Sequence, residues 1–167
     1  MKQSAIAFVL GGAVGTMLGV ALGFFIFPFV FPPPEAFEPP PLPAPVSLAA
    51  EAQPLASGSF IQADPDDNIH YGRGRVTVYD TTLRLEADFV VGPGPDYHVY
   101  LVMAEDVRGP DDIAQGDFVD LGKLRAFKGS QNYAIPEDVY PEEYSSVVIW
   151  SKQSGILISP ANLDFGG

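Results

Sequence analysis

The chain has 167 residues, no cysteine, and 21 acidic against nine basic side chains. An acidic chain without a cluster of Lys and Arg argues against a nucleic-acid partner, because phosphate binding needs concentrated positive charge. The absence of cysteine excludes disulfides, thiolate metal sites, a cysteine nucleophile and covalent haem attachment through paired cysteines.

The N-terminal part of the chain is a long apolar run. Residues 5–31 carry no charge over 27 positions, and Lys2 is the only charged side chain before Glu35. About 20 such residues suffice for a helix to cross a bilayer. A cleaved signal peptide would have a shorter apolar core and a nearby cleavage site, but the first candidate, Ala50-Glu51-Ala52, lies far beyond the run. We therefore predict an uncleaved transmembrane anchor in residues 1–31.

The charges around this anchor predict its orientation. Lys2 and the amino terminus are the positive groups on the short side, which favours a cytoplasmic N-terminus. The C-terminal domain then lies outside the cytoplasm, at the cell membrane, and in the periplasm of a Gram-negative cell.

Four glycines in the anchor repeat at intervals of four residues and so share one helix face; they are Gly11, Gly15, Gly19 and Gly23. Small residues at this spacing let two membrane helices approach closely, which favours a homodimer through the anchor. The alternative is that glycine is simply frequent in membrane helices.

Residues 32–56 form a proline-rich stalk. Nine of the 23 positions from Pro32 to Pro54 are proline. Such a segment favours extended polyproline II structure. We expect it to act as a spacer that pairs with no strand.

Residues 57–167 show the two-residue period of strands. The alternation predicts one buried face of Leu83, Leu85, Ala87 and Phe89 and an exposed face of Arg84, Glu86 and Asp88. We expect this strand to form a hairpin with residues 76–79, and further strands after residue 96, near 118–124 and in the final pair 144–159.

These strands predict an all-β domain, an antiparallel β-sandwich or small barrel. Residues 105–117 read as an acidic loop. We expect no helix outside the anchor except one turn within 136–144.

Seven short motifs follow one another through this region: Gly58-Ser59-Phe60, His70-x-x-x-Gly74, GPDYHVYL (94–101), LGKL (121–124), KGSQNYAIP (128–136), YSSVVIW (144–150) and Ala161-x-Leu163. Their order resembles the DM-thirteen domain, a β-sandwich family labelled electron transfer that includes membrane-anchored bacterial proteins. The resemblance covers nearly all of the region and implies a sandwich fold with a redox role.

The resemblance also draws attention to Ser151. The family typically has cysteine after the tryptophan that matches Trp150, and the implied redox or haem-ligating role depends largely on it. A hydroxyl cannot cycle between thiol and disulfide, and it is a poor ligand for haem iron. We interpret Ser151 as a buried polar residue that hydrogen-bonds to nearby backbone.

Two histidines, His70 and His98, are the weak candidates for holding haem or a metal, as a bis-His pair if the fold brings them together or as a His/Met pair with Met103. The alternative is that both are structural or surface residues. Residues 64–68, DPDDN, carry alternating oxygen ligands that suit calcium but do not follow the EF-hand pattern. They also suit an Asp- and Pro-rich turn.

No catalytic constellation is present in the sequence, because Ser151 lacks a recognisable base and the paired acids Glu137/Asp138 and Glu142/Glu143 lie beside prolines. We expect no enzyme and no resident cofactor or metal. The predicted function is a membrane-anchored, extracytoplasmic module that binds an envelope protein or glycan or has a structural role. The alternative is an electron-transfer module with a non-covalently held cofactor such as haem.

Overall fold

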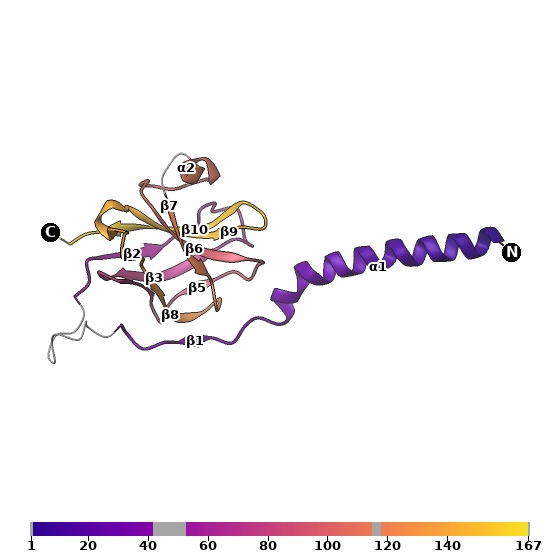
Figure 1. Ribbon diagram of the computed structural model, residues 1–167, viewed down its shortest axis with the longest axis horizontal. Helices are drawn as coiled ribbons and strands as arrows, with labels where there is room; N and C mark the ends of the chain where they lie inside the picture. Colours follow the sequence, from indigo (N-terminus) through magenta and orange to yellow (C-terminus); the bar gives the residue numbers. More distant parts are fainter. Residues whose placement is uncertain (1, 42–52, 115–117, 167) are drawn as a thin grey trace. The chain divides into compact units, whose positions relative to one another are not determined.

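The computed structural model describes residues 2–41, 53–114 and 118–166 (Figure 1). The chain divides into two compact units, Met1–Pro32 and Pro33–Gly167. The first unit holds α1 (Lys2–Val30). In its described ranges the second unit holds ten strands and two short helices, α2 (Pro110–Ala114) and the 3₁₀ turn η1 (Pro141–Glu143).

The N-terminal helix is confirmed as a helix, with Pro28 in its last turn. Its glycine face is open, since nothing lies within 4 Å of the positions that side chains would take at Gly11, Gly15, Gly19 and Gly23. Over the described residues, no helix was found to have the length and hydropathy that a membrane span requires. The spanning part of the prediction is therefore not confirmed.

The strands of the second unit are β1 (Ala36–Phe37), β2 (Ala56–Phe60), β3 (Gly72–Val78), β4 (Thr82–Leu85), β5 (Val90–Val91), β6 (Tyr97–Val102), β7 (Phe118–Lys123), β8 (Gly129–Ala134), β9 (Ser146–Ser151) and β10 (Ile156–Asp164). They form one sheet in the order β1-β8-β4-β3-β2-β10-β9-β6-β7, and β5 also pairs with β3. Every pairing is antiparallel except β1 with β8, which is parallel. The predominantly β prediction is confirmed.

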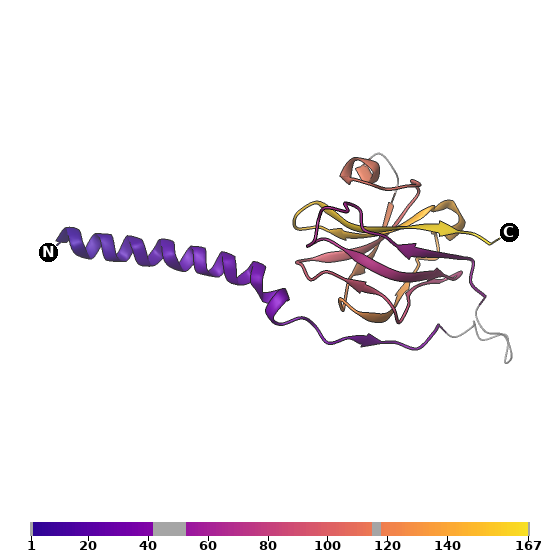
Figure 2. The same ribbon diagram turned by 180° about the vertical axis from the view of Figure 1, so that it is seen from behind.

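This sheet curls on itself, as the two views show (Figure 1 and Figure 2). Its continuous strand order differs from two separate facing sheets, so a sandwich is not confirmed. The inner face buries the main core, in which Val76, Leu101 and Ile149 are inaccessible to solvent. Burial of each such side chain contributes about 1.5–3 kcal/mol.

A second, smaller apolar cluster lies on the outer face of β6 and β9. It includes Tyr100, Val102 and Val148 from these strands, with Val107 and Ile113 from the segment around α2. The short helix therefore covers part of the outer face, where a one-layer sheet would otherwise expose apolar side chains.

The β3–β4 hairpin is confirmed, with Leu85 opposite Val76. The predicted buried face holds at Leu85 and Phe89 but is wrong at Ala87, which is exposed. The strand ends at Leu85, and a turn follows in which the amide of Phe89 donates to the carbonyl of Glu86 at 3.0 Å. Alternation therefore stops predicting burial at residue 86.

The expectation of no helix beyond α1 is wrong for α2, which lies in the predicted acidic loop. The carboxylate of Asp112 accepts hydrogen bonds from the amides of Arg108 and Gly109, the two residues before this helix, at 2.8 and 3.0 Å. The single turn expected within residues 136–144 is confirmed as η1. Residues 115–117 of the loop lie outside the described ranges.

The proline-rich segment is not wholly a spacer. β1 pairs with β8, with Ala36 opposite Gly129 and Phe37 opposite Ser130. The expectation that the segment pairs with no strand is wrong here, because residues 35–38 contain no proline and retain their amide donors. Residues 42–52 lie outside the described ranges.

One buried side chain, Gln131 on β8, joins the segment after β7 to the rest of the sheet. Its Oε1 accepts from the amides of Arg125 and Ala126, both at 3.1 Å, and from the Tyr133 hydroxyl at 3.0 Å. Its Nε2 donates to the carbonyl of Ala126 at 2.9 Å. Gln131 is inaccessible to solvent. Its side chain therefore supplies the hydrogen bonds that the backbone of residues 125 and 126 would otherwise make to water or to a neighbouring strand.

We predict that Gln131→Leu lowers the free energy of unfolding by about 2–4 kcal/mol, because it leaves the amides and carbonyl of residues 125 and 126 without their buried partner. Urea denaturation of the purified chain measures the change. Gln153→Leu, the same substitution at an exposed position between β9 and β10, should stay within about 0.5 kcal/mol of wild type. Equal losses for the two variants would contradict this role of Gln131.

Candidate functional site

Three stacked rings line the outer face of β6, β7 and β9; we call Phe118, Tyr100 and Trp150 the aromatic row. The Tyr100 ring stacks on Phe118 at 4.8 Å between centroids and on Trp150 at 6.4 Å, with interplanar angles of 17° and 26°. Tyr100 is buried between its neighbours, Trp150 is half-buried, and Phe118 is 46% exposed. The row therefore presents aromatic surface to solvent mainly at Phe118.

Strand pairing explains why these rings meet. Side chains alternate across a strand, so His98 and Tyr100 share the outer face of β6. In the register of β6 with β9, His98 lies opposite Trp150. In the register of β6 with β7, Val102 lies opposite Phe118, which brings Phe118 diagonally over Tyr100.

A set of charged side chains borders the aromatic row; we call Asp96, His98, Asp120, Lys123 and Lys152 the charged rim. His98 Nδ1 lies 2.9 Å from Asp120 Oδ1, and His98 Nε2 lies 3.7 Å from Asp96 Oδ1. Lys152 Nζ contacts Asp120 Oδ2 and Lys123 Nζ contacts Asp96 Oδ1, each at 3.1 Å. Both ring nitrogens of the histidine therefore face carboxylates.

The surroundings of the rim hold its carboxylates in the charged form. Burial would raise the pKa of Asp120, but hydrogen bonds from His98, the Gly122 amide and Lys152 together lower it. The hydrogen bond from Lys123 is the main cause that lowers the pKa of Asp96. Burial, together with the charges of Asp120 and Asp96, raises the pKa of Tyr100 to about 12. At neutral pH the site thus offers fixed charges beside a neutral phenol.

Ser151 lies on the inner face, one residue after Trp150 and 1% exposed. Its hydroxyl donates to the carbonyl of Pro95 at 3.0 Å and accepts from the Ser154 hydroxyl at 2.7 Å. These bonds tie the β9–β10 turn to the loop before β6. Alternation puts His98 on the other face, so the two side chains form no nucleophile–base pair.

His70 lies in the turn between β2 and β3, where it is bound to Asp67. Its Nδ1 is 2.6 Å from Asp67 Oδ2, and its amide donates to Asp67 Oδ1 at 3.0 Å. These two bonds, followed by the amide of Ile69, lower the pKa of Asp67 to about 2. Asp64 accepts from the amide of Asp66 at 3.0 Å in the same turn. In the stretch considered for calcium, these two carboxylates therefore bond the local backbone.

Each histidine is bonded to a carboxylate, His70 to Asp67 and His98 to Asp120. Over the described ranges, no group of three or more His, Asp or Glu side chains is placed to hold a metal ion. Met103 packs against the main core, whereas His98 faces outward, so the His/Met pair is not formed. His98 also has carboxylates near both nitrogens and fits poorly as an axial haem ligand.

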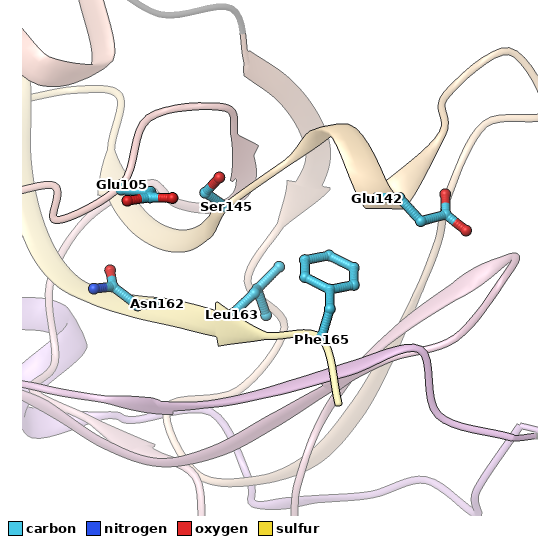
Figure 3. A pocket seen from close by; sticks show the side chains of 6 residues that line it. All are labelled: Glu105, Glu142, Ser145, Asn162, Leu163 and Phe165. Atoms are coloured by element: carbon cyan, nitrogen blue, oxygen red, sulfur yellow. The ribbon is translucent and has the colours of Figure 1, made fainter. Parts of the chain in front are cut away.

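A pocket of about 360 Å³ lies near the end of β10; it is lined by Glu105, Glu142, Ser145, Asn162, Leu163 and Phe165. Figure 3 shows the two carboxylates on opposite sides of Leu163 and Phe165. The Asn162 amide is already used, since it donates to Asp106 Oδ1 at 2.6 Å. Two carboxylates, two polar side chains and two apolar side chains line this hollow, and the sequence analysis did not identify it.

A family model described as "Electron transfer DM13" matches residues 65–163, more than half of the chain. The chain belongs to this family. The resemblance inferred from the motifs is thereby confirmed. The DM13 match includes β3 to β9, the aromatic row and the whole charged rim. The comparisons found no match among curated proteins and none among solved structures.

Sequence analysis singled out His98 as a weak ligand candidate but missed the aromatic row. The available signal was the two-residue spacing of His98 and Tyr100, opposite Val99 and Leu101. The row itself depends on β6 lying between β7 and β9, a pairing that no local pattern specifies.

Proposed function

We propose that this DM13 protein is a non-enzymatic module that binds a neutral glycan through the aromatic row and the charged rim. The observation that carries the proposal is Phe118, an exposed ring stacked on Tyr100 beside fixed charges. Sugar rings present C–H faces that stack on aromatic rings, and an exposed aromatic side chain supplies large contact area.

The charged rim can supply hydrogen bonds to the hydroxyl groups of the sugar. Sugar hydroxyls both donate and accept hydrogen bonds, and the rim holds carboxylate acceptors at Asp96 and Asp120 and ammonium donors at Lys123 and Lys152. The net charge of −12 repels polyanions, which favours neutral glycans over phosphate-rich ones.

The glycan-binding test uses insoluble chitin and cellulose, which are neutral polysaccharides. The full chain should sediment with at least one of them, and Phe118→Ala should weaken binding by about tenfold, the loss of about 1.4 kcal/mol expected for a stacked ring. Phe37→Ala removes an exposed ring at the other end of the strand order and should leave binding unchanged. No sedimentation, or equal loss in the two variants, would count against the proposal.

We also propose that the module is held at the outer side of the cell membrane by residues 1–31, with the N-terminus in the cytoplasm and the glycine face as a site for pairing of anchors. The support is the sequence, namely 27 uncharged residues preceded by Lys2.

In cells, the full chain should stay in the membrane fraction after an alkaline carbonate wash, and external protease should digest its C-terminal domain. A chain that lacks residues 2–31 should lose membrane association. Release of the full chain by the wash would show that the segment is no anchor.

Electron transfer is the second candidate function, and the family description favours it. Without cysteine, a redox cofactor would have to be held by other groups, and both histidines are already bonded to carboxylates. Their geometry therefore supports this candidate less than glycan binding.

If the chain carries electrons through bound haem, it should show the visible absorption of haem. The chain purified from haem-supplemented cells should show a stoichiometric Soret band that shifts on reduction and disappears in His70→Ala or His98→Ala. We expect a featureless spectrum instead. A histidine-dependent Soret band would replace the binding module with an electron carrier.

A further inference from the structure

Residues 35–39, which we call the strap, include β1, which lies beside β8 (Figure 1). In the strand order, β1 takes the edge of β8 that is opposite β4. The amides of Ala36 and Glu38 donate to the carbonyls of Lys128 and Ser130 at 2.9 and 3.1 Å. The Ser130 hydroxyl donates to the carbonyl of Glu38 at 2.9 Å. The strap thus adds to the sheet as an extended peptide does in strand addition.

Side chains of the domain recognise both the carboxylate and the carbonyls of the strap. Arg125 lies 3.0 Å from Glu38 Oε1, and the amide of Asn132 donates to Glu38 Oε2 at 2.8 Å. Arg84 Nη1 donates to the carbonyls of Glu38 and Pro39 at 3.1 and 2.9 Å. The Asn132 side chain donates to the carbonyl of Pro39 at 2.8 Å.

Arg84 is also held by neighbours within the sheet. Its side chain is only 7% exposed; its Nε donates to Glu86 Oε2 at 3.1 Å and its Nη1 donates to the side-chain oxygen Asn132 Oδ1 at 2.9 Å. The sequence predicted an exposed Arg84, which is wrong because the strap covers it. A preorganised donor loses little freedom on binding, so it favours affinity.

The backbone of the strap lies against Gly129 at Ala36. Its φ is +89°, and a Cβ there would overlap the carbonyl of Ala36. Only glycine therefore lets the strap lie so close to β8. Charge matches as well, since Arg84, Arg125 and Lys128 gather at this edge of an otherwise acidic domain.

The strap is held by polar surface contacts. Across the described residues, the two apolar core clusters include none of its members, and Phe37 is 77% exposed. Its loss from the β8 edge would therefore remove no member of either core cluster. Segments with few buried apolar contacts open at low free energy.

We propose that the β8 edge is a binding site for an extended acidic peptide of a partner protein, in which a glutamate precedes proline, and that the strap occupies this site as an internal competitor. Strap release is then the step that a partner must drive. This site is separate from the aromatic row and does not depend on glycan binding.

The test measures binding of a fluorescent peptide of residues 33–41, PPEAFEPPP, to the full chain in detergent by anisotropy. In Glu38→Lys the strap is repelled by Arg84 and Arg125, so the free site should bind the peptide at least about tenfold more tightly than wild type does. Glu35→Lys makes the same charge change but removes only an exposed contact with Lys128 at 3.7 Å, so it should behave as wild type.

Further variants locate the bound peptide. Adding Arg125→Ala to Glu38→Lys should weaken peptide binding by at least about fivefold, the loss expected for a charged hydrogen bond. A peptide with lysine at the Glu38 position should not bind. Glycan binding should be unchanged in Glu38→Lys, so failure of one proposal is distinguishable from failure of the other.

Three outcomes would overturn the proposal. If the peptide does not bind to Glu38→Lys, the strap is a permanent part of the sheet and no partner peptide replaces it. Equal binding to wild type and Glu38→Lys would place the peptide elsewhere. A wild-type dimer that is lost in Glu38→Lys would identify a second copy of this chain, and not a partner peptide, as the occupant of the edge.

Discussion

The buried amide of Gln131 is the interaction on which the curled sheet most depends. A sheet of one layer must bend far to enclose a core, and its ends then meet without regular pairing. Gln131 bonds the backbone of residues 125 and 126 from β8, so the segment that leaves β7 is satisfied without a strand partner. An apolar residue there would fill the space but leave those groups unbonded.

The two ends of the strand order carry different surfaces. At one end, β7 joins β6 and β9 in an outer face that carries aromatic rings and fixed charges. At the other end, β8 accepts a segment from the proline-rich region. Both surfaces use polar groups that are held in place by neighbours, as with His98 between two carboxylates and Arg84 between Glu86 and Asn132.

Ser151 has a structural role in the observed fold. Its hydroxyl serves the backbone of Pro95 from inside the domain, and neither histidine is placed beside it. The glycan binding proposed above would use stacking on the aromatic row and hydrogen bonds to the charged rim. The family description favours electron transfer, whereas the glycan proposal is based on the aromatic row.

The sequence by itself determined the helical structure of α1, the β3–β4 hairpin and the final strand pair, because each depends on a local pattern of apolar residues. It also determined the family, because the order of the motifs is specific to it. It failed at Ala87, where alternation outlasted the strand, and at α2, which is too short to show a helical period. Only the tertiary structure decided that Arg84 is buried, that the strap adds to β8 and that three rings stack. These features need contacts between residues distant in the chain, and the two-residue period of a strand says which face a side chain takes but not which strand lies beside it.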